Sequence, residues 1–219
     1  MPNAYTRISR CVMLELGLEK AVSVLNAEGI IIYPTETFYG IGCKISSEKA
    51  ISSIFQAKKR LLALPLPTIV SNLEQVYAFT QLSSTVRSDV EELAKLFWAG
   101  PLTLILPAKK NVSALLTGGT GTLAVRLSSH PAAVALAEGV GEPIVSSSAN
   151  ISGKEPVSDF SALDEELLKR VNGYVNLPPK PQGGFASTII SVQGDKKIKI
   201  LRHGAVSLEQ LSEQGYRAI

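Results

Sequence analysis

The stretch from residue 30 to residue 42, I-I-I-Y-P-T-E-T-F-Y-G-I-G, constrains the fold more than any other part of the chain. Residues 30–33 form a short apolar run without interruption, which is typical of a strand buried on both faces. Pro34 has no backbone N–H and therefore marks the point where this strand leaves its sheet. The stretch favours a sheet that is covered on both sides by other elements.

Polar side chains crowd the positions directly after this strand. Hydroxyls, a carboxylate and a phenol occupy residues 35–39, and two glycines close the stretch. Such groups are costly to bury unless they are paired. Open α/β sheets bind their ligands at the ends of strands. A plain turn would account for the proline and the glycines but not for the polar cluster, so we predict a ligand site here.

Composition indicates an ordinary globular protein. The chain has 219 residues, 45% hydrophobic and 19% charged, which suffices for one sizeable core. It contains no apolar run near the ~20 residues that a membrane helix needs, and residues 1–10 lack the apolar segment of a signal peptide. Cys11, Cys43 and the two histidines have no metal-ligand spacing. We therefore expect a cytoplasmic protein with no disulfide framework and no bound metal.

Helical and strand patterns alternate along the rest of the chain. We expect helices at 18–28, from Ser46 or Ser47 to about Lys58, and at 73–80, 86–97, from Pro131, 164–170 and 208–214. We expect strands at 68–70, 102–106, 123–127 and 143–145, and a β-hairpin of 187–192 with 197–201. The segment 117–122 is rich in glycine but lacks the Gly-Lys-Ser/Thr of a Walker loop. The segment 178–184 is either a lid or a plain connection.

Several cations stand at the ends of these elements. Lys58 and Arg60 close the second helix, where they complement the helix dipole or bind phosphate. Arg126 alternates with apolar residues in a strand, so it faces solvent or is paired with an anion, because an unpaired buried charge is very costly. Arg202 ends the last strand. The net charge of +3 is mild and does not by itself indicate nucleic acid.

Neutral donors gather at two further strand ends. The segment S-S-S-A-N-I-S-G, residues 146–153, follows the strand at 143–145, and Ser187 begins the hairpin. Such a set of hydroxyls and an amide can hold phosphate oxygens, a nucleobase edge or a carboxylate, or it can satisfy its own turn. Four cations with many neutral donors, and without a pair of carboxylates, suit a ligand with several phosphates beside a smaller carboxylate ligand. His130 precedes a helix and is interpreted as a helix-start residue.

Seven motifs in order make the chain resemble the YrdC-like family of threonylcarbamoyl-AMP synthases. They are Y-P-T-E-T-F-Y-G-I-G (33–42), F-Q-A-K-K-R (55–60), F-W-A-G-P-L-T-L-I-L-P (97–107), L-A-V-R-L (123–127), S-A-N-I-S-G (148–153), S-T-I-I (187–190) and I-L-R-H-G-A-V-S (200–207). The resemblance implies a single α/β domain over 1–219, with its core at about 17–207. It also implies a twisted mixed sheet, packed helices and a concave basic cleft. The expected form is the short one, without a further C-terminal domain.

The resemblance also implies a reaction. Threonine and bicarbonate or carbon dioxide give a carbamate, which attacks the α-phosphorus of ATP and releases pyrophosphate. A partner threonylcarbamoyl transferase complex then passes the group to N6 of an adenosine in tRNA, the t6A modification. Mg²⁺ would arrive with ATP, which is a substrate. Two alternatives are an RNA-binding module that uses the same cleft without catalysis, and a carbamoyl-transfer domain like that of hydrogenase-maturation proteins.

Roles for individual residues follow from the same resemblance. Lys58 and Arg60 would be the catalytic cations. The expected ATP-binding residues are these two together with Ser148, Asn150, Ser187 and Arg202. The expected threonine-binding residues are Thr35, Thr122, Arg126 and Ser146, with Arg126 on the substrate carboxylate.

Overall fold

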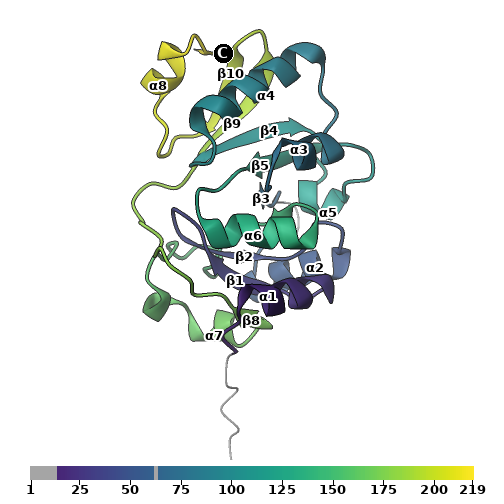
Figure 1. The fold of residues 1–219 in the computed structure, drawn as a ribbon, viewed down its shortest axis with the longest axis vertical. Coiled ribbons are helices and arrows are strands. Elements are labelled where there is room, and N and C mark those ends of the chain that lie inside the picture. The colour runs from purple at the N-terminus through teal and green to yellow at the C-terminus, as the bar shows by residue number, and fades with distance from the viewer. Residues whose placement is uncertain (1–13, 62–63) are drawn as a thin grey trace, which may run out of the picture.

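The computed structural model describes residues 14–61 and 64–219 (Figure 1). The polar N-terminus at 1–10 and Cys11 lie outside the described residues. Its helices are α1 (Leu18–Asn26), α2 (Glu48–Lys58), α3 (Leu73–Phe79), α4 (Ser84–Phe97), α5 (Ala114–Thr117), α6 (Pro131–Val140), α7 (Glu165–Leu168), α8 (Leu208–Glu213) and the 3₁₀ turn η1 (Phe160–Ala162). Its strands are β1 (Ile31–Pro34), β2 (Tyr39–Gly42), β3 (Thr68–Ile69), β4 (Leu102–Pro107), β5 (Thr122–Arg126), β6 (Ile144–Val145), β7 (Ser147–Ser148), β8 (Gly173–Tyr174), β9 (Thr188–Gly194), β10 (Lys197–Arg202) and β11 (Arg217–Ala218).

The strands form two mixed sheets. The larger sheet has the order β11-β10-β9-β4-β5-β3-β6, and the smaller has the order β7-β2-β1-β8. In Figure 1 the larger sheet lies in the upper part of the molecule and the β1–β2 hairpin lies below it. The predicted α/β fold with a mixed sheet is confirmed, but the structure has a second sheet. The second sheet exists because residues 39–42 form a strand that returns antiparallel to β1.

Strand β1 is buried on both faces, as its apolar run predicts. Ile32 belongs to the main hydrophobic core, whereas Ile31 and Tyr33 belong to a second core. The second core also holds α1 and the alanine-rich helix α6, whose small side chains allow close packing. Every residue of β1 must therefore be apolar or paired. The Tyr33 hydroxyl donates to the backbone oxygen of Val145 at 2.8 Å.

The larger sheet presents two different faces, which is visible in the alternation L-T-L-I-L of β4. Leu102, Leu104 and Leu106 pack into the main core, to which the buried apolar side chains of α4 also contribute. Thr103 and Ile105 alternate with them and therefore lie on the opposite face. That opposite face looks toward the smaller sheet, and the space between the two sheets holds the site described below.

Two helices begin where the sequence predicts. The Ser47 hydroxyl caps α2 by accepting from the N–H of Ala50, and the His130 ring caps α6 by accepting from the N–H of Ala132. Helix α1 ends at Asn26, two residues before the predicted end at 28. No helix within residues 14–61 and 64–219 combines the length and the apolar character that a membrane crossing requires.

Candidate active site

A cavity of about 330 Å³ lies between the two sheets, within the size range of small-molecule sites. The larger sheet lines it with Thr68, Thr103, Ile105, Ala124, Arg126, Ile189, Leu201 and Arg202. The β1–β2 turn and β7 line it with Thr35, Thr37, Phe38, Tyr39, Gly40, Ser146, Ser147 and Ser148. Arg60, Pro65, Pro67, Pro156, Ala186 and Ser187 complete the lining. No carboxylate occurs among these described lining residues.

Seven of the ten predicted site residues meet in this cavity. They are Thr35, Arg60, Arg126, Ser146, Ser148, Ser187 and Arg202. They come from segments far apart in the sequence, and the facing of the two sheets brings them together. Lys58, Asn150 and Thr122 are not among the lining residues.

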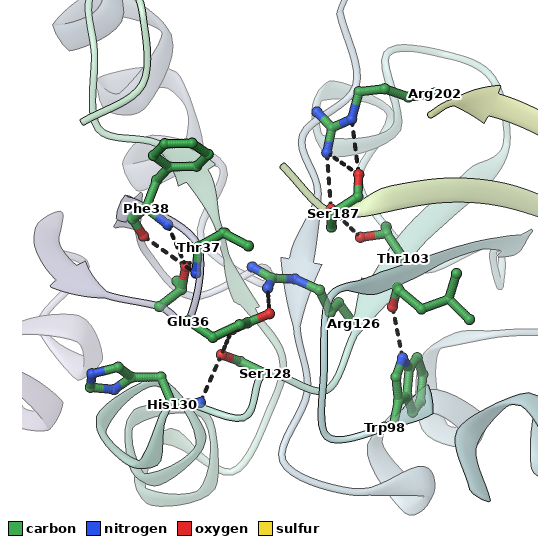
Figure 2. Close-up of polar contacts among 12 residues, drawn as sticks. Glu36, Thr37, Phe38, Trp98, Thr103, Arg126, Ser128, His130, Ser187 and Arg202 are labelled. Carbon is green, nitrogen blue, oxygen red and sulfur yellow. Dashed lines mark hydrogen bonds and ion pairs between the residues drawn. The ribbon is translucent and has the colours of Figure 1, made fainter. Parts of the chain in front are cut away.

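Arg126 is paired with Glu36 from the β1–β2 turn (Figure 2). Its side chain is only 9% exposed and that of Glu36 only 11%, so solvent screens the pair weakly. The second carboxylate oxygen of Glu36 accepts a hydrogen bond from the Ser128 hydroxyl. The sequence left two alternatives for Arg126, exposure to solvent or pairing with an anion, and it indicated that a buried carboxylate at 35–39 needs a partner. The structure shows the second alternative, because Arg126 and Glu36 pair with one another.

Arg202 lies at the other side of the cavity, held by Ser187. Its Nη2 donates to the backbone oxygen of Ser187 at 2.7 Å and to the Ser187 hydroxyl oxygen at 2.9 Å. The Ser187 hydroxyl also lies 2.9 Å from that of Thr103, which fixes it to β4 (Figure 2). Burial lowers the pKa of Arg202, and the nearby positive charge of Arg126 lowers it further. An anion placed between the two arginines would relieve both effects.

Arg60 donates through Nη2 to the backbone oxygen of Pro65 at 3.0 Å. Its Nε is buried and has no hydrogen-bond partner within the described part of the chain. Burial lowers the pKa of Arg60. A half-buried guanidinium with an unused donor at a cavity wall suits an anionic ligand.

Lys58 differs from the prediction, because it lies behind the cavity wall. Its side chain is almost completely buried, and its Nζ donates to the backbone oxygens of Ser148 and Asn150, the latter at 2.7 Å. Burial, with a smaller contribution from the charge of Arg60, lowers the pKa of Lys58 to about 7. Lys58 therefore holds the loop that carries Ser148 and reaches the cavity only through that loop.

Asn150 also serves the loop instead of lining the cavity. Its Nδ2 donates to the backbone oxygens of Ile151 at 3.0 Å and Lys154 at 2.6 Å. Its Oδ1 lies 3.5 Å from Nζ of Lys58. Of the two interpretations of this segment, the self-satisfied turn describes Asn150, whereas Ser146 and Ser148 face the cavity.

Thr35 lines the cavity but uses its hydroxyl within its own turn. Its Oγ1 donates to the backbone oxygen of Phe38 at 2.7 Å and lies 3.3 Å from the N–H groups of Thr37 and Phe38. Thr122 lies elsewhere, at the start of β5, where its hydroxyl is 2.9 Å from that of Thr120. Four residues along a strand separate Thr122 from Arg126, which is about 13 Å, and this distance keeps Thr122 out of the cavity.

The segment at 178–184 is tied to the turn that carries Glu36. The N–H of Gln182 donates to the backbone oxygen of Glu36 at 3.1 Å, and that of Gly183 donates to Thr37 at 2.8 Å. Nε2 of His130 lies 2.7 Å from the backbone oxygen of Pro179. Burial lowers the pKa of His130, which favours the neutral ring and with it an N–H donated to Pro179. In this structure the segment supports the β1–β2 turn.

Sequence reasoning missed three residues that support the arginines, namely Glu36 as the partner of Arg126, Ser128 behind Glu36, and Thr103 behind Ser187. Glu36 carried a signal, because a carboxylate in a buried turn needs a cation. Nothing in the sequence indicated the contacts of Ser128 and Thr103. Among residues 14–61 and 64–219, no group of three or more His, Cys, Asp or Glu side chains is placed to hold a metal ion.

Comparisons with known proteins identify relatives of the chain. The model of the Sua5, YciO and YrdC family, described as "Telomere recombination", matches residues 23–204. Threonylcarbamoyl-AMP synthase of Pyrococcus abyssi is 34% identical over 199 residues, which is 91% of this chain and 57% of that protein. The enzyme of the same name from Escherichia coli K12 is 40% identical over 141 residues, 64% of this chain and 73% of that protein.

A solved structure of P. abyssi Sua5 complexed with L-threonine superposes with a TM-score of 0.84 at 31% identity. The match covers 92% of this chain and 58% of that one. This chain therefore spans little more than half the length of the P. abyssi protein. The match of the family model over most of the chain, and the close agreement of the folds, show that the chain belongs to the Sua5/YciO/YrdC family.

Proposed function

We propose that the chain is an ATP-dependent L-threonylcarbamoyladenylate synthase, a nucleotidyltransferase that uses L-threonine, bicarbonate or carbon dioxide, and ATP. The observation that carries this proposal is the meeting of Arg60, Arg126 and Arg202 in one cavity whose described lining has no carboxylate. Such a cavity attracts a ligand with several negative charges. Family relatives are named Threonylcarbamoyl-AMP synthase, and one related structure is complexed with L-threonine. We extend both properties to this chain.

Arg60 and Arg202 would bind the triphosphate and the leaving pyrophosphate. Both donate to neutral oxygens, and neither forms an ion pair within the described residues, so a bound phosphate would meet a charge that no carboxylate has offset. Ser148 and Ser187 would add neutral donors to the phosphate oxygens. Lys58 and Asn150 would contribute by holding the loop of Ser148. A phosphate at that loop would also raise the pKa of Lys58 and favour its ammonium form.

Arg126 would bind the carboxylate of threonine. Its positive charge is already offset by Glu36, so it suits a ligand group with a single charge and a fixed geometry better than a triphosphate. Ser146 and Thr35 line the same cavity and would border the amino-acid part of the ligand.

The chemistry requires positioning and charge stabilisation more than a strong base. The amino nitrogen of threonine forms a bond to carbon dioxide and loses a proton to water, which gives a carbamate. A carbamate oxygen then attacks the α-phosphorus, and the bond to the β-phosphate oxygen breaks. Arg60 and Arg202 would stabilise the charge that develops on the leaving pyrophosphate. Mg²⁺ would enter as the complex with ATP.

The product is a reactive mixed anhydride, so a second enzyme must use it before it hydrolyses. We propose that a threonylcarbamoyl transferase passes the group to tRNA in the cytoplasm. The names of the relatives favour this reading over the RNA-binding and carbamoyl-transfer alternatives.

Pyrophosphate release tests the proposal. The purified protein is incubated with ATP, Mg²⁺, L-threonine and bicarbonate, and each component is omitted in turn. Release is expected only when all are present, and Arg60→Ala is expected to abolish it. Release that does not depend on threonine, or no release from the folded wild-type protein, would refute the synthase assignment.

A further inference from the structure

Of the four cations predicted for the site, one lies behind the cavity wall and three line the cavity, and within the described residues only Arg126 is paired with a carboxylate. Lys58, Arg60 and Arg202 donate to backbone oxygens or a hydroxyl, whereas Arg126 forms an ion pair with Glu36. This difference in partners indicates that Arg126 has a different task from the other three. A guanidinium that must meet a planar carboxylate needs a fixed direction, because its bidentate geometry is specific.

Glu36 is itself held at both oxygens. Oε1 accepts from Nη1 of Arg126, and Oε2 accepts from the hydroxyl of Ser128, which is completely buried. The Ser128 hydroxyl oxygen in turn accepts from the N–H of His130 at 3.2 Å, at the start of α6. The carboxylate therefore connects Arg126 on β5 to the rigid start of a helix (Figure 2).

Glu36 is not among the residues that line the cavity, although its neighbours Thr35 and Thr37 are. Its backbone is fixed as well, because its carbonyl oxygen accepts from the N–H of Gln182 at 3.1 Å. A carboxylate in this place has no direct access to a ligand in the cavity. Glu36 can therefore affect that ligand in two ways only, through its charge or through the position of Arg126.

We propose that Glu36, held by Ser128, is a positioning residue that directs the Arg126 guanidinium at the carboxylate of the amino-acid substrate. The proposal rests on the proposed function, because it needs an amino acid at Arg126. It adds Glu36 and Ser128, which would determine how Arg126 binds the substrate carboxylate without contacting the substrate themselves.

The sign of the effect distinguishes positioning from simple electrostatics. Removing the negative charge of Glu36 makes the cavity more positive, which by itself strengthens the binding of every anion. Loss of positioning leaves Arg126 free to turn to other oxygens, which weakens the binding of the amino-acid carboxylate only. If only the charge of Glu36 matters, Glu36→Gln strengthens threonine binding. If Glu36 positions Arg126, Glu36→Gln weakens threonine binding.

The test is calorimetric titration of wild-type and Glu36→Gln protein with L-threonine, with 1-aminopropan-2-ol, which lacks the carboxylate, and with ATP. We expect Glu36→Gln to raise the Kd for threonine about tenfold or more, the value of one charge-assisted contact. The Kd for 1-aminopropan-2-ol, which is a cation, is expected to rise much less than that for threonine, because this ligand has no carboxylate for Arg126, and the Kd for ATP is expected to stay the same or fall. In turnover, KM for threonine is expected to rise more than kcat falls.

Two further variants keep the test decisive if Glu36→Gln does not fold. Ser128→Ala retains the ion pair and removes one hydrogen bond to Glu36, so a weaker, threonine-specific loss of affinity is expected. Glu36→Asp retains the charge but shortens the side chain by one methylene. If only charge mattered, Glu36→Asp would bind threonine as the wild type does, whereas positioning predicts weaker binding.

Glu91→Gln is the matched control, because it breaks another Glu–Arg pair, with Arg87 at 3.0 Å on the exposed side of α4. It is expected to leave all three dissociation constants unchanged. Unchanged or tighter threonine binding in folded Glu36→Gln or Ser128→Ala would overturn the positioning role and leave the proposed function standing. A wild-type protein that does not bind threonine would overturn both.

Discussion

Nζ of Lys58 lies 2.7 Å from the backbone oxygen of Asn150, and this contact places the cation behind the wall of the cavity. Lys58 and Arg60, which the sequence presents as one cationic cluster, therefore have separate tasks. Lys58 supports the loop that carries Ser148, and Arg60 faces the cavity.

The first prediction separates these two tasks. Lys58→Ala is expected to lower the free energy of unfolding by about 1–3 kcal/mol, because it leaves buried backbone oxygens without a donor. Arg60→Ala is expected to cost less stability but to abolish pyrophosphate release. Urea denaturation and the release assay, run on both variants, measure the two effects. Equal urea midpoints for Lys58→Ala and the wild type would contradict the structural task of Lys58.

The second prediction concerns pH. Because the pKa of Lys58 is lowered to about 7 in the folded protein, the unfolded chain binds more protons than the folded one above that pH. The contribution of Lys58 to stability should therefore be flat below pH 7 and rise as the pH increases toward the ordinary lysine value. The free energy of unfolding, measured between pH 6 and pH 8.5 for the wild type and for Lys58→Met, should show this rise in the wild type only.

Burial raises the pKa of Cys43, so at higher pH this thiol loses its proton more readily in the unfolded chain than in the folded protein. Cys43 therefore lowers the free energy of unfolding as the pH rises, whereas Lys58 raises it. The difference between the two proteins, taken at each pH, removes the contribution of Cys43. A difference that does not change across the range would show that Lys58 stays protonated in the folded state.

The third prediction concerns the Arg202 side of the cavity. Arg202→Ala is expected to weaken ATP binding by about 1.5–3 kcal/mol, the value of a hydrogen bond to a charged group. Ser187→Ala is expected to weaken it by only about 1 kcal/mol, because the backbone oxygen of Ser187 still holds Arg202. Calorimetric titration with ATP measures both, with Arg217→Ala on the exposed strand β11 as the control. If Arg202→Ala bound ATP as tightly as the wild type, Arg202 would not be a phosphate-binding residue.

The fourth prediction uses two glycines of one strand. A Cβ at Gly42 would lie 2.1 Å from the backbone oxygen of Val145, whereas a Cβ at Gly40 would lie 3.3 Å from the Ser146 hydroxyl. Gly42→Ala is therefore expected to unfold at a clearly lower temperature than the wild type, because backbone cannot move aside easily. Gly40→Ala is expected to change stability little and to weaken threonine binding through Ser146. Thermal denaturation of both variants tests whether Gly42→Ala melts at a lower temperature than Gly40→Ala, and equal melting temperatures would contradict this prediction.

Local signals in the sequence predicted much of the fold. The apolar strand at 30–33, the helix-start residues Ser47 and His130, and the strand at 102–106 each depend on near neighbours, and each is confirmed. Strand β2 was missed because two of its four residues are glycines, which are poor strand formers. Its pairing with β1 and the close approach of Val145 explain both the strand and the glycines.

The candidate site was predictable as a set of residue types but not as a set of partners. Both Arg126 and Glu36 carried the signal of a charge that needs an opposite charge, yet they lie 90 positions apart and meet only because the two sheets face one another. Lys58 and Thr122 were placed in the site by their motifs. Their distance from the cavity depends on side-chain direction and strand position, which the sequence alone does not determine.

The most direct measurement of the central claim follows labelled carbon into the product. The protein is incubated with ATP, Mg²⁺, L-threonine and ¹³C-bicarbonate, and the products are analysed at once by mass spectrometry. We predict a labelled species that contains both AMP and threonine, formed together with pyrophosphate and lost in Arg126→Ala. Pyrophosphate without this labelled species, or the same species in the absence of added threonine, would contradict the account.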